Sequence, residues 1–157
     1  QTQGCYKGYV DLKMQEKYGA AYKEEIEKEA EKLFITNLIT QNKIISVYDL
    51  DEAEKPKIIS SKVNIESNYY TTMETVIPVV NNKFFAIDMS FIVEKDGTIS
   101  NIKLSNWANE NPENEEHKQV FIDQAISILK GDYNHWKPGK YKGNVARTEN
   151  TLRIRFE

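Results

Sequence analysis

The stretch FFAIDMSFIVEKDGTISNIKL, residues 84–104, decides the fold of this chain. Every second side chain from Phe85 to Val93 is apolar, which is typical of a β-strand with one face against a core. Asp96-Gly97 follows, and both residues tolerate the positive φ angles of a tight hairpin turn. The stretch therefore predicts two antiparallel strands joined at this dipeptide.

The end of the chain, VARTENTLRIRF at residues 145–156, predicts a third strand. Its apolar residues, Leu152 among them, alternate with arginines such as Arg153, so one face of the strand lies against the core and the other is charged. We expect a single core cluster between the sheet and a helix. Its expected members are Phe91, Ile102, Ile126, Trp136 and Ile154.

Helical patterns flank these strands. An apolar stripe with a spacing near four predicts a helix over residues 16–39, whereas residues 1–12 carry little pattern. Asn111-Pro112 is a good helix start, and Gly131 ends that second helix. Residues 43–50, 58–65 and 69–80 are rich in β-branched residues and tyrosine and predict further strands. The fold class expected is α+β, with an antiparallel sheet packed against helices.

Composition excludes several classes of partner. The chain has 157 residues and a formal net charge of -3, and no basic run dominates, so nucleic acid is not an expected partner. No apolar run approaches the ~20 residues that a membrane helix needs, so no membrane span is expected.

The start of the chain bears on localisation. Gln1 indicates a trimmed chain or a mature secreted chain whose signal peptide was removed. Cys5 is the single cysteine, so no internal disulfide forms. Gly4-Cys5 matches part of a lipoprotein cleavage site but lacks the apolar residue three positions before the cysteine. An incidental thiol is therefore the expectation, and lipid anchoring at Cys5 is the alternative.

The sequence offers no catalytic constellation. His117 and His135 are the only histidines and have no cysteine or carboxylate at ligand spacing, so no metal site is predicted. There is no glycine-rich phosphate loop and no nucleophile elbow, so no cofactor is predicted. Asp88 and Glu94 lie roughly 20 Å apart along one strand, too far for a catalytic carboxylate pair. We expect that the protein is not an enzyme.

The order strand, Asp-Gly hairpin, strand, helix, Trp-Lys-Pro-Gly and final strand resembles the C-terminal domain of TonB, the periplasmic end of an envelope energy transducer. The resemblance covers residues 84–157. It divides the chain into an N-terminal helix-plus-strand region at residues 1–75 and a TonB-like domain at residues 76–157. Its motif residues are Asp96, Gly97, Trp136, Pro138, Gly139 and Gly143.

This resemblance implies a periplasmic or secreted protein that adds a partner segment to a sheet edge, the partner being of the outer-membrane transporter type. The chain departs from the family pattern ahead of the first strand, where Ile77-Pro78 stands in place of Tyr-Pro. It also shows no membrane anchor and no proline-rich spacer. The domain therefore belongs to a longer protein, or it serves a purpose other than energy transduction.

The final strand is the expected binding edge, because no later segment can cover it. The partner-binding residues predicted there are Val145, Arg147, Glu149, Thr151, Arg153 and Arg155. Alternatives stay open: a charged face that only discourages aggregation, or a homodimer through this strand. Trp136 is expected in the core, with a partner contact as the alternative. A different function is a secreted ligand-binding or hydrolytic protein whose N-terminal half supplies a pocket.

Overall fold

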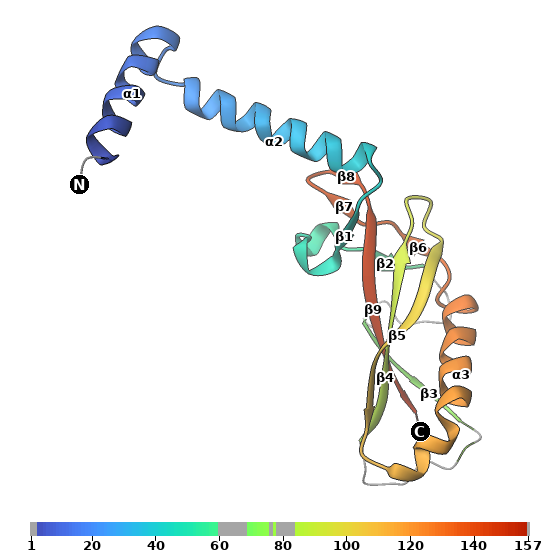
Figure 1. The fold of residues 1–157 in the computed structure, drawn as a ribbon. Coiled ribbons are helices and arrows are strands. Elements are labelled where there is room, and N and C mark those ends of the chain that lie inside the picture. The colour runs from blue at the N-terminus through green and yellow to red at the C-terminus, as the bar shows by residue number, and fades with distance from the viewer. Residues whose placement is uncertain (1–2, 60–68, 76, 78–83, 157) are drawn as a thin grey trace. The chain divides into compact units, whose positions relative to one another are not determined.

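A computed structural model describes residues 3–59, 69–75, 77 and 84–156 (Figure 1). The fold is α+β, as the sequence predicts. The chain divides into two compact units, Gln1–Gln41 and Asn42–Glu157. This division differs from the expected boundary near residue 75, because two short strands of the expected N-terminal region pair with the last strand of the chain.

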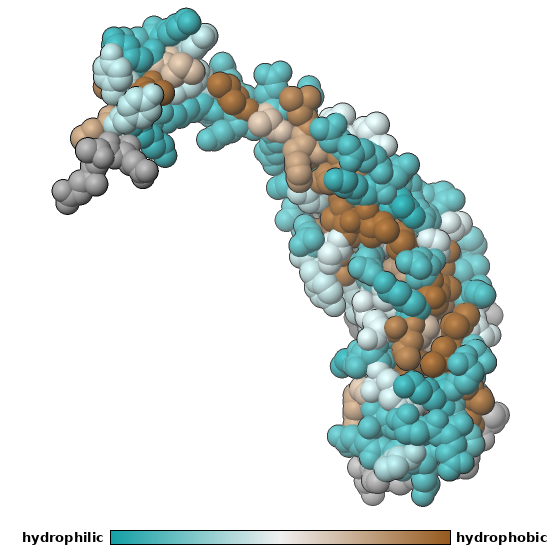
Figure 2. Space-filling model, viewed as in Figure 1, coloured by the Kyte–Doolittle hydropathy of each residue, from teal (hydrophilic) through white to brown (hydrophobic). Residues whose placement is uncertain are grey.

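The first unit consists of two helices, α1 (Gln3–Tyr18) and α2 (Tyr22–Thr40). The sequence predicted one helix over residues 16–39 and missed α1. The break falls at Gly19, whose φ of 96° is a conformation that glycine adopts at little cost. The apolar stripe of α2 does not form a core here, since Ile26 is 57% exposed and Leu33 60% exposed. Brown, hydrophobic atoms are accordingly visible on the surface of this unit in Figure 2.

The second unit is built on a mixed sheet. Its strands are β1 (Ile44–Ser46), β3 (Tyr70–Met73), β4 (Phe85–Val93), β5 (Ile99–Asn109) and β9 (Arg147–Phe156). Strand β9 lies between β4 on one side and β1 and β3 on the other, and β5 lies beyond β4. The three strands β5, β4 and β9 are antiparallel, as expected, whereas β1 and β3 run parallel to β9.

Short elements complete this unit. Two small ladders pair β2 (Lys57–Ile58) with β6 (Trp136–Lys137), and β7 (Lys140–Tyr141) with β8 (Asn144–Val145). In the described part of the chain, the 3-10 turns η1 (Val47–Asp49), η2 (Glu52–Glu54) and η4 (Pro112–His117) connect these elements. Helix α3 (Lys118–Lys130) follows η4 and lies alongside the sheet (Figure 1). Parts of the strands expected at 58–65 and 69–80, including Pro78, lie outside the described residues.

The hairpin at Asp96-Gly97 is confirmed. Gly97 has a φ of 85°, and its N–H donates to the Glu94 carbonyl at 3.0 Å. Asp96 accepts hydrogen bonds from the backbone and the hydroxyl of Thr98, which fixes the turn. In the described part of the chain, β5 pairs with β4 alone, and its register is shifted twice along that pairing. Such bulges twist an edge strand and hinder pairing with other chains.

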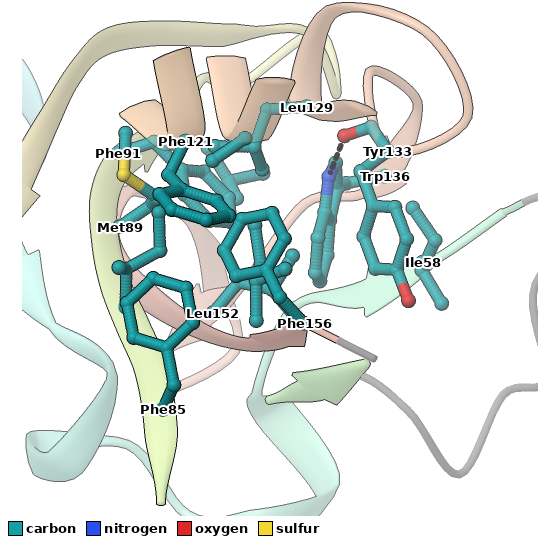
Figure 3. Close-up of a cluster of buried hydrophobic side chains, with 14 residues drawn as sticks. Ile58, Phe85, Met89, Phe91, Phe121, Leu129, Tyr133, Trp136, Leu152 and Phe156 are labelled. Atoms are coloured by element: carbon teal, nitrogen blue, oxygen red, sulfur yellow. Dashed lines mark hydrogen bonds between the residues drawn. The ribbon is translucent and has the colours of Figure 1, made fainter. Parts of the chain in front are cut away.

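The core lies between α3 and the inner face of the sheet. Figure 3 shows the phenylalanine rings of β4, α3 and β9 gathered together, with Phe85 and Phe121 4.6 Å apart between ring centres. The expected cluster is confirmed: Phe91, Trp136 and Ile154 are buried in it, and Ile102 and Ile126 pack against it. Trp136 donates its indole N–H to the Tyr133 carbonyl at 2.7 Å, which satisfies its polar atom inside the core.

The expectation that the last strand has a free edge is wrong. Strand β9 is bonded to β4 from Thr148 to Arg155 on one side. On its other side it pairs with β1 over Arg147–Glu149 and with β3 over Arg153–Phe156. The chain thus uses its own segments to cover the edge that the sequence assigned to a partner, because segments far upstream in the sequence return to the end of the chain.

Candidate functional site

The strand pairing of β1 and β3 along one edge of β9 is interrupted. Strand β1 ends opposite Glu149, and β3 begins opposite Arg153, so the residues between them have no strand partner on that side in the described part of the chain. Thr151 lies at the centre of this gap. The Arg153 N–H donates to the Tyr69 carbonyl at 2.9 Å and so points toward β3. Main-chain groups two residues apart on a strand point the same way, and the N–H and C=O of Thr151 therefore face the gap.

A hollow of about 410 Å³ lies at this interruption. Three tyrosines form part of its wall: Tyr48 from η1, Tyr69 just before β3, and Tyr70 at the start of β3. Tyr48 is 81% exposed, although a large ring normally buries part of its surface. The gap thus combines main-chain groups that have no strand partner among the described residues with aromatic surface, the two kinds of contact that hold an extended peptide.

An ion pair forms the floor of the hollow. Arg153 donates through Nε to Asp88 Oδ1 at 2.7 Å and through Nη2 to Asp88 Oδ2 at 2.9 Å. Asn106 adds a third hydrogen bond to this carboxylate at 3.1 Å. The pairing with Arg153 holds the pKa of Asp88 below its ordinary value, although partial burial opposes the shift. Arg153 Nη1 makes no hydrogen bond to another described residue and can serve a ligand.

The predicted partner-binding residues do not form one site. Thr151 and Arg153 line the hollow. Arg147 instead forms a bidentate pair with Glu94, at 2.7 and 2.8 Å, and donates to the Asn42 carbonyl. Glu149 accepts from Ser90 Oγ at 2.9 Å and lies 3.4 Å from Lys103 Nζ. These residues form a ladder of polar contacts across the outer face of the sheet, which favours the structural interpretation for them.

The remaining two predicted residues lie apart from the hollow. Val145 belongs to β8 rather than to the last strand and pairs with Lys140. Arg155 lies on β9 between the partners Ala86 and Thr72. Sequence reasoning missed Tyr48, Tyr69 and Tyr70, because their common position depends on the parallel pairing of β1 and β3 with β9. Nothing in the local pattern indicates that pairing.

The motif residues of the predicted TonB-like region also make contacts through the backbone. The Trp136 N–H donates to the Gly97 carbonyl at 2.8 Å, so the hairpin turn and the Trp-Lys-Pro-Gly segment meet. Gly139 is buried against Thr148, Pro56 and Leu50, and its carbonyl accepts from the Ala146 N–H. Gly143, with a φ of 82°, forms the turn between β7 and β8. These contacts position the strands, and none of them places a motif residue in the hollow beside Thr151.

A second hollow of about 350 Å³ is lined by Asn42, Glu94, Lys95, Asp96 and Arg147. Its charged groups already bond one another, since Lys95 donates to Asn42 Oδ1 at 2.6 Å and Glu94 is held by Arg147. The Arg147 guanidinium lowers the pKa of Glu94. Fewer donors are left for a ligand here than beside Thr151, so the hollow at the gap is the stronger candidate.

Among the described residues, no group of three His, Cys, Asp or Glu side chains is placed to hold a metal ion. None of the described helices is long and apolar enough to cross a bilayer. Cys5 is a free, exposed thiol on α1. The sequence matches no protein-family model, and no curated protein and no solved structure matches the chain.

Proposed function

We propose that this chain is a protein-interaction module of the cell envelope, resembling the TonB C-terminal domain, that binds a short extended segment of a partner protein. The segment lies in the hollow at Thr151, between the ends of β1 and β3. The proposed site differs from the one expected from the sequence, which ran along the whole last strand. The module needs no cofactor and performs no reaction.

The observation that carries the proposal is the interruption at Thr151. A segment parallel to β9 would accept a hydrogen bond from the Thr151 N–H and donate one to its carbonyl. It would also continue the line of β1 and β3, which are both parallel to β9. Main-chain bonding of this kind supplies affinity, whereas the surrounding side chains select the sequence. Tyrosine and arginine are the residues that most often dominate protein interfaces, and the hollow presents three tyrosines and Arg153.

Peptide binding tests the proposal directly. The probe is a panel of acetylated, amidated hexapeptides that includes periplasm-facing segments of outer-membrane transporters, with affinity measured by fluorescence polarisation. We expect at least one peptide to bind, and Tyr48→Ala to weaken it by about tenfold or more, the effect of losing one aromatic contact of 1.4 kcal/mol. The matched control is Tyr6→Ala, because Tyr6 is 74% exposed but lies on α1.

Amide exchange supplies the main-chain readout. The Thr151 amide should exchange more slowly when the peptide is bound, because its N–H then donates to the peptide. A peptide that binds with equal strength to the Tyr48→Ala protein, and leaves exchange at Thr151 unchanged, would place the interface elsewhere and refute the proposal.

A second candidate is a small, neutral ligand in the same hollow, such as a saccharide. Tyr48, Tyr69 and Tyr70 all belong to the first half of the chain, the half expected to supply a pocket. Asp88 and Arg153 cancel each other in charge and present both acceptors and donors. Hydrolysis is not favoured, because the lowered pKa makes Asp88 a poor general acid, and both oxygens of its carboxylate are already bonded to Arg153. Saturable NMR shifts at Tyr48 with cellobiose or maltose, and no peptide binding, would support this candidate.

A further inference from the structure

Two lysine-containing segments that are far apart in the sequence meet at the small ladder of β2 and β6. Lys57 pairs directly with Lys137, and the neighbouring pair is Ile58 with Trp136. Ile58 and Trp136 are buried in the core, so the two lysines project to the opposite, exposed side. Cβ atoms of such a pair are about 4.5–5.5 Å apart, and like charges in this position repel each other.

A compact hollow of about 60 Å³ lies beside this pair. Its wall also contains Lys55, Lys140, Glu54 and Pro138. The adjoining Gly139 is buried against Thr148, Pro56 and Leu50, with no room for a Cβ atom, so the segment that carries Lys137 and Lys140 is closely packed.

The acids nearby are already engaged. Glu52 pairs with Lys55 at 2.6 Å. Glu54 accepts hydrogen bonds from the backbone N–H groups of Lys142 and Gly143, at 3.1 and 2.6 Å, and so fixes the turn between β7 and β8. Lys57, Lys137 and Lys140 have no ion pair with a described residue. Three ammonium groups that no described carboxylate compensates thus gather at one hollow, on a chain whose formal net charge is -3.

We propose that this lysine cluster, made of Lys57, Lys137 and Lys140, binds a phosphate group. A dianionic, tetrahedral group offsets the repulsion between Lys57 and Lys137 and accepts hydrogen bonds from several ammonium groups at once. A carboxylate carries one charge and leaves two of the three lysines uncompensated. The small hollow suits a compact anion better than an extended one. The phosphate belongs to a free anion or to a phosphomonoester headgroup such as that of phosphatidic acid, because both can carry two negative charges on a tetrahedral group.

The first test uses inorganic phosphate, with sodium chloride at equal ionic strength as the reference and NMR shifts of the Lys57 and Lys137 amides as the readout. We expect saturable shifts with a Kd on the order of 1 mM, as a few exposed charge contacts provide. Lys57→Gln with Lys137→Gln should weaken binding by about tenfold or more. Lys57→Arg with Lys137→Arg keeps both charges and should retain binding, which also controls for any loss of folding in the glutamine variant.

The matched control, Lys13→Gln with Lys28→Gln, removes the same charge from exposed helical positions and should bind phosphate as the unaltered chain does. Sedimentation with vesicles that contain phosphatidic acid, against phosphatidylcholine vesicles, then distinguishes the two sources of phosphate. Binding to the anionic vesicles that depends on Lys57 and Lys137 identifies a lipid headgroup, and phosphate binding without vesicle binding identifies a free anion. Shifts that sodium chloride reproduces, or an equal loss in the control variant, would overturn the proposal.

Discussion

The two faces of β4 and β9 differ in their side chains, although the same two strands supply both and β4 is buried along its whole length. On the inner face Phe91, Met89 and Ile154 are fully buried against α3 and its neighbours. On the outer face Asp88 pairs with Arg153 across the same two strands. Successive residues of one strand thus point to opposite faces, so that one set packs in the core and the other forms polar pairs. Substitutions on the inner face should therefore cost far more stability than substitutions on the outer face.

The sharpest contrast is between Phe91 and its neighbour Ser90. Phe91→Ala removes a fully buried ring that lies 5.4 Å from Trp136 between ring centres, and should cost roughly 3–5 kcal/mol. Ser90→Ala removes one hydrogen bond to Glu149 and should cost only about 0.5–1.5 kcal/mol. Urea unfolding of both variants measures the difference. Equal losses would show that the inner face is not the main source of stability.

The turn at Gly97 determines which residues of β4 and β5 lie opposite each other. A Cβ atom at this position would clash with the Trp136 carbonyl oxygen, and the φ of 85° disfavours any side chain. Gly97→Ala should therefore destabilise the protein by about 2–4 kcal/mol, the sum of the left-handed backbone cost and the steric displacement. Thermal unfolding measures the loss. Gly8→Ala is the control, because a Cβ atom there meets nothing within 4 Å.

Asn150 breaks the pattern of the inner face. Its side chain is fully buried, and neither its amide nitrogen nor its oxygen finds a hydrogen-bond partner in the described part of the chain. An unpaired buried amide is costly, and leucine has a similar volume without polar atoms. Asn150→Leu should therefore stabilise the protein by about 1–2 kcal/mol in urea unfolding. Destabilisation would mean that Asn150 has a polar partner in solution.

Much of the second unit was predictable from the sequence, because its signals are local. Period-two apolar spacing predicted β4 and β9, Asp96-Gly97 predicted the turn, and Asn111-Pro112 predicted the start of the helical segment that leads into α3. Core membership followed from the same spacing, since residues of one parity share a face. The break at Gly19 was missed because a single glycine inside a helical pattern is usually tolerated.

The candidate site was not predictable in the same way. Strand β1 has three residues and β3 has four, so their sequences carry too little period to show that both pair with β9. The gap at Thr151 exists only because of those two pairings. The lysine cluster likewise depends on the pairing of Lys57 with Lys137, whereas charge counted along the chain shows no basic patch there. Long-range pairing therefore created both proposed sites.

The smallest expected effect belongs to the outer face and depends on pH. Arg153 lowers the folded-state pKa of Asp88, and Arg147 lowers that of Glu94. A carboxylate whose pKa is lower in the folded state stabilises the protein at pH values above its unfolded-state pKa, which is 3.8 for aspartate and 4.5 for glutamate. This stabilisation is lost as the pH falls through the pKa of the folded state. Because Arg153 is 46% exposed, the Asp88 pair should contribute only about 0.5–1 kcal/mol.

Urea unfolding between pH 7 and pH 3 tests this contribution. Asp88→Asn with Glu94→Gln should reduce the acid-side loss of stability, because neither amide can take up a proton. Part of the slope should remain, since Thr98 also lowers the pKa of Asp96. A double variant with the same pH dependence as the unaltered chain would show that the outer-face pairs are fully screened by solvent. The ion pairs of the outer face would then contribute nothing to the stability of the sheet.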